Sequence, residues 1–106
     1  MLLSQNNFLK HIREEATFII SQTADLTLND LEQTLILQKA LLRSLKVIGE
    51  ATKLLDSSFR QKYPYIDWKA MAGTRDKLIH DYFNVDIDLV YDICKTNIPA
   101  LLIDMN

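Results

Sequence analysis

Apolar residues recur every three or four positions between about Leu31 or Gln33 and Leu55. This is the period of an α-helix with a buried face, so the sequence predicts one long helix there. Two apolar stripes run side by side along it, which makes the apolar arc wider than one buried face requires. The helix is therefore either central in a bundle or in contact with another subunit, and the two alternatives are compatible. The stripes are Leu37, Leu41, Ile48, Ala51 and Leu55, and Ala40, Val47, Ala51 and Leu54.

The residues before this helix predict two more helical pieces. The first is expected from about Gln5 to Thr23, because apolar side chains again follow the helical period. Thr27 and Asp30 resemble a capping box with Asp in place of the preferred Glu, so a short helical turn should follow. The buried stripe of the first helix is expected to be Phe8, Ile12, Ala16 and Ile19.

Capping residues and prolines divide the second half of the chain. Ser57 and Ser58 are candidate caps of a short turn through Lys62, and Pro64 ends that region. Asp67 should cap a helix that runs from Trp68 to about His80 or Tyr82. The remaining signals are a cap at Asp86 for a helix from Ile87, a break or fresh helix start at Asn97 and Pro99, and apolar packing at Leu101 and Leu102.

Composition supports one helical domain spanning residues 1–106. Apolar residues make up 48% of the chain and charged residues 25%, which is typical of a globular domain and not of a disordered one. Two Gly and two Pro leave little room for the turns of a β-sandwich or barrel. We therefore predict an all-α bundle of four to six helical pieces.

Charge and cysteine content exclude several classes of protein. A formal net charge of −2 argues against a general nucleic-acid coat, although a local basic site remains possible. The single Cys excludes an internal disulfide and fits a reducing compartment. Neither a membrane-spanning stretch nor a secretory signal is visible, so the cytoplasm is the expected location.

The chemically informative residues lie close together between positions 75 and 82. Asp76 and His80 are four residues apart and share a helix face, so the carboxylate is placed to orient the imidazole. Arg75 and His80 are five apart, about 140° around the axis, and converge only where the helix ends or two copies meet. One interpretation is a solvated helix end with Tyr82 as a half-buried anchor. The other is a phosphodiester site with His as the proton-transfer group and Arg as the fixed cation.

The spacing Arg-x4-His-x-Tyr, occupied by Arg75, His80 and Tyr82, resembles the signature of HEPN domains of the HepT type. The resemblance covers nearly the whole chain and is strongest from Ile48 to Leu101. Asp67 replaces the usual Pro before Trp68, and Asn84 replaces a frequent Gly; neither change affects the proposed chemistry. The other matching segments are Ile48-Gly49-Glu50-Ala51, Asp67 to Gly73, His80 to Phe83 with Val85-Asp86, and Ile98-Pro99 leading to Leu101.

The resemblance implies a homodimeric, metal-independent RNA endonuclease that is the toxin of a type VII toxin–antitoxin pair, with no cofactor and no membrane association. Arg75 and His80 would be catalytic and Asp76 supporting, with the residues of both copies lining one cleft. The partner would be a minimal nucleotidyltransferase antitoxin that transfers AMP from ATP to Tyr82. A second hypothesis makes the chain mainly a binding partner and substrate of that enzyme, with little or no nuclease activity.

Other conspicuous residues have structural interpretations. Glu50 is expected to be a partly buried acceptor that holds a neighbouring helix, and the alternative is a carboxylate near the cleft. Gly49 and Gly73 should allow close helix approach, Gly73 to a partner subunit. Two distant His residues and one Cys do not form a metal site. Trp68 should be a packing anchor, Cys94 a core or near-surface thiol, and His11 solvated.

Overall fold

The computed structural model describes residues 5–79 and 85–105, and between positions 74 and 79 it describes only the side chain of Lys77. Within these ranges the chain is helical and has no strand, so the predicted all-α class is confirmed. Because α6, η1 and α7 follow one another without a gap, these ranges hold six separate helical pieces. The segments are α1 (Gln5–Thr23), α2 (Leu28–Glu32), α3 (Leu35–Leu54), α4 (Ser57–Arg60), α5 (Trp68–Ile79), α6 (Ile87–Asp92), the π-helical turn η1 (Ile93–Asn97) and α7 (Ile98–Met105).

Helices α1 and α2 form where the sequence predicts them. α1 has the expected bounds and buries Ile12, Ala16 and Ile19, whereas Phe8 is only partly buried and its neighbour Leu9 is buried instead. The capping box before α2 is present: the Asp30 N–H donates to Thr27 Oγ1, and the Thr27 N–H donates to Asp30 Oδ2, both at 3.1 Å. These bonds satisfy two backbone donors that a helix start leaves open, which stabilises a helix of only five residues.

Helix α3 starts later than predicted. Leu31 belongs to α2 and Gln33 is its C-cap, so the long helix begins only at Leu35. Thr34 separates the two helices with φ −123° and ψ 87°, which is not a helical conformation. Leu31 belongs to α2, but its side chain is buried in the same core, so the apolar period continues through this corner. The sequence pattern therefore predicts one helix where the structure has two.

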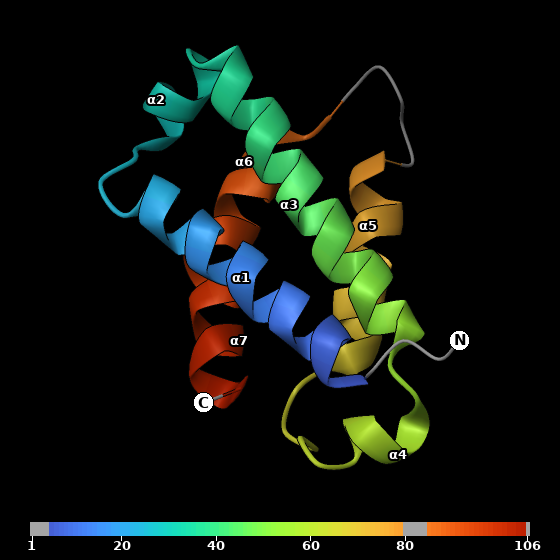
Figure 1. The fold of residues 1–106 in the computed structure, drawn as a ribbon. Coiled ribbons are helices and arrows are strands. Elements are labelled where there is room, and N and C mark those ends of the chain that lie inside the picture. The colour runs from blue at the N-terminus through green and yellow to red at the C-terminus, as the bar shows by residue number, and fades with distance from the viewer. Residues whose placement is uncertain (1–4, 80–84, 106) are drawn as a thin grey trace.

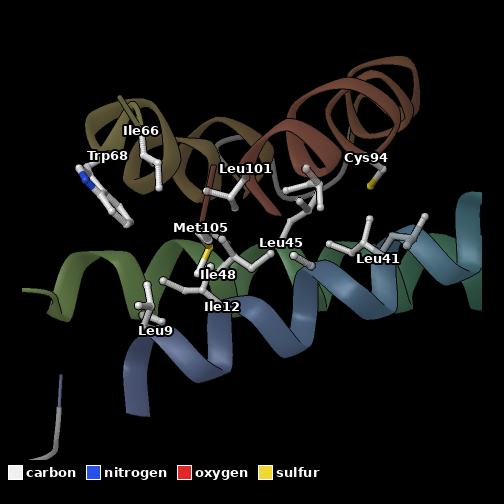
Figure 2. Packing of buried hydrophobic residues seen from close by; sticks show 14 of the residues in the cluster. Leu9, Ile12, Leu41, Leu45, Ile48, Ile66, Trp68, Cys94, Leu101 and Met105 are labelled. Atoms are coloured by element: carbon white, nitrogen blue, oxygen red, sulfur yellow. The ribbon is translucent and has the colours of Figure 1, made fainter. Parts of the chain in front are cut away.

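The long helix α3 is the centre of the bundle. It packs against α1 and α5 and also contacts α2 and α6 (Figure 1). Leu41, Leu45 and Ile48 point from it into an interior shared with side chains of α1 and α7 (Figure 2). This confirms the first of the two explanations for its wide apolar arc. Part of the arc is not covered, since Ile36 is 84% exposed and Leu54 is 56% exposed.

The turn after α3 is capped by a different residue from the one predicted. Asp56, and not Ser57 or Ser58, is the N-cap of α4, and the turn ends at Arg60. Asp56 Oδ1 accepts from the Phe59 N–H at 2.8 Å and from Ser58 Oγ at 2.9 Å. The Phe59 bond, followed by that of Ser58, holds the pKa of Asp56 below its ordinary value of 3.8. Both bonds go to one oxygen of an ionised carboxylate, and hydrogen bonds to an ionised acceptor are stronger than those to a neutral one.

The chain stays helical at Pro99: of the two predicted alternatives the break does not occur, and a fresh helix, α7, starts at Ile98. Proline lacks an N–H and clashes with the carbonyl four residues earlier in a regular α-helix. Here the π turn η1 precedes it, and the Ile98 N–H donates to the Ile93 carbonyl five residues back. This wider turn lets α7 start at Ile98 as a direct continuation.

Cys94 of that turn lies fully in the core, and burial raises the pKa of its thiol to about 12. No helix within the described ranges has the length and apolar character that crossing a membrane requires.

Candidate functional site

Helix α5 carries the first part of the predicted motif. Arg75 and Asp76 lie on its last two turns, as the sequence predicts. His80 and Tyr82 lie outside the described residues, and so do the side-chain positions of Arg75 and Asp76. The convergence of these four side chains therefore stays a prediction. What the structure describes is how α5 is held in place.

The start of α5 is fixed by a cap and a buried indole. Asp67 Oδ1 accepts from the Ala70 N–H at 3.0 Å, which confirms Asp67 as the cap. The Trp68 indole N–H donates to the carbonyls of Arg60 and Tyr63, both at 3.1 Å. Its ring meets Tyr63 edge to face at 6.3 Å between centroids. Trp68 is thus the packing anchor that the sequence predicts, and it ties α5 to the preceding loop.

That loop is in turn bound to the end of α3. Arg60 Nη2 donates at 2.7 Å to the Thr52 carbonyl in the last turn of the helix, which also accepts from the Leu55 N–H at 3.2 Å. The Asp56 N–H donates to Gln5 Oε1 at 2.8 Å, and Gln5 Nε2 donates to the Leu54 carbonyl at 3.3 Å. The orientation of the motif helix therefore depends on α3 and α1, through contacts made far from the motif.

A groove of about 320 Å³ lies beside the first turns of α5. Leu45 and Ile48 of α3 lie on one wall, with Ala70 and Met71 of α5 beside them. Across the groove are residues of η1 and α7, and Figure 1 shows α5 beside α3 and α7 beside α1. Its charged lining residues are Asp67 and Asp104, both acidic. An acidic rim repels phosphate, so this groove is not suited to hold an RNA backbone.

Sequence reasoning missed this groove. Its lining comes from three segments, each separated from the next by 16 residues or more: 45–48, 65–71 and 93–104. No local pattern joins them, because the groove exists only where α5 packs on α3 and the C-terminal helix packs on α1.

Gly49 and Glu50, neighbours in the Ile-Gly-Glu-Ala stretch, differ in burial. Gly49 is buried, which agrees with a close approach of elements at α3. Glu50 is exposed, so the prediction that it is partly buried is wrong. The reason is its position: with Ile48 facing the core at 2% exposure, a residue two further on points about 200° away. Gly73 has open space where a side chain would begin, which leaves room for a partner beside Arg75.

Other candidate residues have no described role in a site. His11 is exposed, as predicted. Lys69 and Lys77 of α5 are both exposed. Within residues 5–79 and 85–105, no group of three or more His, Cys, Asp or Glu side chains is arranged to hold a metal ion.

Comparison with known proteins finds one family. The family described as "Ribonuclease HepT-like" matches residues 12–105. A Thermococcus cleftensis protein named "Probable ribonuclease HepT" is 37% identical over 101 residues, 95% of this chain and 92% of that protein. A Methanocaldococcus jannaschii protein named "Putative RNase MJ0127" is 45% identical over 92 residues, 87% of this chain and 76% of that protein. No solved structure matches the chain.

Proposed function

The chain belongs to the HepT-like ribonuclease family, and from that premise we propose that it is a metal-independent RNA endonuclease with Arg75 and His80 as its catalytic residues. The observation that carries the proposal is that the family match runs from residue 12 to 105 and so includes the complete Arg-x4-His-x-Tyr motif. A protein that cleaves cellular RNA would act in the cytoplasm.

The proposed chemistry uses RNA's own hydroxyl group. His80 accepts the proton of the 2′-hydroxyl, whose oxygen attacks the adjacent phosphorus. Arg75 binds the phosphorane oxygens, on which negative charge develops, with its planar guanidinium. The bond from phosphorus to the 5′-oxygen breaks, that oxygen takes up a proton, and a 2′,3′-cyclic phosphate remains. Asp76 orients the imidazole. A metal is not required, because the nucleophile is already part of the substrate.

We further propose that two copies of the chain form the cleft. Arg75 and His80 are about 140° apart on a regular helix, so one copy alone does not direct both side chains to the same phosphate. Two motifs facing each other across a two-fold axis remove that difficulty. The open space at Gly73 and the exposed Ile36 and Leu54 are compatible with such an assembly.

Regulation is proposed to act on Tyr82. A cognate minimal nucleotidyltransferase antitoxin would transfer AMP from ATP to the Tyr82 hydroxyl and release pyrophosphate. The attached phosphate would bring negative charge and bulk to the cleft and compete with RNA for Arg75. The chain would then be the toxin of a toxin–antitoxin pair, silenced by modification.

Cleavage of a labelled RNA in EDTA tests the nuclease. The purified chain, shown by mass to be unmodified, should release fragments ending in a 2′,3′-cyclic phosphate. Arg75→Ala and His80→Ala should each lower the rate by about 10²-fold or more. The matched control is His11→Ala, since His11 is the chain's other histidine and is exposed on α1. Cleavage that persists in both motif variants would refute the proposal.

The second hypothesis, a partner and substrate without nuclease activity, is favoured by Tyr82 and by the net charge of −2. Incubation with the cognate transferase and ATP, followed by intact-mass analysis, tests the modification. Mass should increase by whole AMP units in the wild type and in Tyr65→Phe, whose tyrosine is 62% exposed, but not in Tyr82→Phe. Modification without any RNA cleavage by the unmodified chain would favour this hypothesis over the nuclease.

A further inference from the structure

The solvent-facing side of α3 carries a row of positive charges. Lys39, Arg43 and Lys46 are all exposed and follow one another at intervals of four and three residues. This alternation places them on one ridge of the helix, about 10 Å long at a rise of 1.5 Å per residue. Glu50 and Lys53 continue the same ridge toward the end of the helix. We call Lys39, Arg43 and Lys46 the basic ridge.

The positive charge of the basic ridge is not neutralised within the described part of the chain. None of its three side chains forms an ion pair or hydrogen bond there. Lys10 and Glu14, by contrast, pair at 3.8 Å on α1. Glu50 follows Lys46 by one turn on the same ridge, and none of the described residues forms an ion pair with the three cations, which therefore form a local positive potential that the net charge of −2 conceals.

The basic ridge lies at the same level of the bundle as the motif. α3 and α5 run in opposite directions (Figure 1), and the groove places Leu45 and Ile48 beside Ala70 and Met71. One turn onward from Met71 is Arg75. Because the two helices are antiparallel, the matching step on α3 goes back one turn, about 6 Å, from Leu45 and Ile48 and reaches Arg43. Arg43 on α3 and Arg75 on α5 therefore lie at the same height along the two packed helices, to within about one turn.

We propose that the basic ridge of α3 binds the phosphate backbone of RNA next to the cleavage cleft, as a binding site separate from the catalytic residues. This inference rests on the proposed nuclease function and adds a site to it. RNA held on Lys39, Arg43 and Lys46 extends along α3 while one of its phosphates occupies the cleft at Arg75. The ridge contributes affinity without base specificity, because lysine and arginine bind phosphate through charge.

The composition of the ridge favours RNA over a protein partner. Two of its three residues are lysines, and lysine is depleted where proteins bind one another. The ridge itself also lacks the aromatic anchors that dominate protein interfaces. Phosphate backbones, by contrast, are bound by regularly placed lysines and arginines. The acidic groove, which is lined by the buried face of α3 at Leu45 and Ile48, does not offer the RNA an alternative path.

The test compares two double variants with the same change in charge. Lys39→Gln/Arg43→Gln removes two ridge cations, and Lys10→Gln/Lys62→Gln removes two exposed cations elsewhere. Binding of a labelled single-stranded RNA is measured by fluorescence anisotropy over a series of salt concentrations, with His80→Ala present in every protein to prevent cleavage. Cleavage kinetics are measured with His80 intact, and sedimentation and circular dichroism check assembly and helicity.

The ridge variant should bind RNA more weakly, and its plot of log affinity against log salt should be shallower by about 1.4, since each lost single-strand phosphate contact removes about 0.7. KM should rise while kcat stays close to that of the wild type. The control variant should change the slope by less than half as much. An equal effect of both variants, an unchanged slope, or an altered oligomeric state in the ridge variant overturns the inference.

These outcomes differ from a failure of the proposed function. If the chain is not a nuclease, the wild type itself cleaves no RNA. If only the ridge is wrongly assigned, the wild type cleaves and the ridge variant matches it in KM. A ridge variant that retains RNA binding but loses binding to the nucleotidyltransferase overturns the inference in favour of a protein partner.

Discussion

At the scale of single residues, the positions that orient the motif helix are polar groups with defined partners. Trp68 donates one N–H to two carbonyls, and Arg60 donates to the Thr52 carbonyl at the end of α3. Asp56 and Asp67 cap the two helices that this loop connects. The loop is therefore held by hydrogen bonds to backbone groups, each of which would be costly to leave unsatisfied once buried.

Replacing the indole tests the importance of this anchor. Trp68→Phe keeps an aromatic ring but leaves the Arg60 and Tyr63 carbonyls without the indole donor. The free energy of unfolding should fall by about 1–3 kcal/mol, because the fold loses both indole hydrogen bonds and part of a buried side chain, while the Tyr63 and Ile66 N–H groups still donate to these carbonyls. Urea denaturation measures the change, and Tyr65→Phe on the exposed side of the same loop should leave stability nearly unchanged. Equal stability of the two variants would contradict the anchoring role.

The Asp56 cap predicts a pH dependence of stability. Its pKa in the folded protein is lowered below 3.8 by hydrogen bonds from Phe59 and Ser58. The ionised carboxylate therefore stabilises the fold above its unfolded pKa, and this contribution is lost as pH falls through the folded value. The stability advantage of wild type over Asp56→Asn should be full at neutral pH and should shrink below about pH 4. Asp25→Asn, an exposed position between α1 and α2, is the control, and an advantage that does not change with pH would refute the assignment.

At the scale of elements, α3 determines the positions of the other helices. Its core face contacts α1 on one side and α5 on another, so a cavity there loosens both packings. Its exposed face carries the basic ridge and the uncovered Ile36 and Leu54. One helix thus supplies the core, the support of the motif helix and the proposed RNA contact.

Two leucines of α3 provide a matched test of that role. Leu45 is 1% exposed and Leu54 is 56% exposed on the same helix. Leu45→Ala should lower the free energy of unfolding by about 2–5 kcal/mol through the cavity that it creates. Leu54→Ala should stay within about 0.5 kcal/mol of wild type if its surroundings are open in solution. Chemical denaturation of both variants measures the difference, which should disappear if α3 is not central.

The stability of Leu54→Ala also tests assembly. A loss of unfolding free energy well above about 0.5 kcal/mol would mean that another copy of the chain covers Leu54. The same result would support the expectation that the second stripe of α3 faces a partner.

At the scale of the whole molecule, the proposed cleft requires two copies. Sedimentation equilibrium should give twice the chain mass of 12.3 kDa at concentrations where RNA is cleaved. The midpoint of thermal unfolding should rise with protein concentration, because association stabilises the folded state. A monomer that cleaves RNA with full activity would contradict the two-copy cleft.

Most of the fold was predictable from local patterns. The bounds of α1, the capping box of α2, the Asp67 and Asp86 caps and the central place of α3 follow from apolar period and capping chemistry, which act over a few residues. The errors have local causes too. Leu31 is buried and maintains the apolar period through the corner at Thr34, so the sequence predicts one helix where there are two. At Pro99 the π turn keeps the chain helical, so of the two predicted alternatives only the fresh helix start occurs.

By itself, the sequence determined the helical class, most helix boundaries and the family motif that places Arg75 and Asp76 on α5. Only the tertiary structure decided which carbonyls Trp68 and Arg60 reach, that Glu50 is exposed, and that an acidic groove and a basic ridge lie on different sides of the bundle. The physical reason is the distance along the chain over which each interaction acts. Helical period and caps depend on residues three or four apart, whereas grooves and hydrogen bonds between elements depend on how whole helices pack, which no short window of sequence contains.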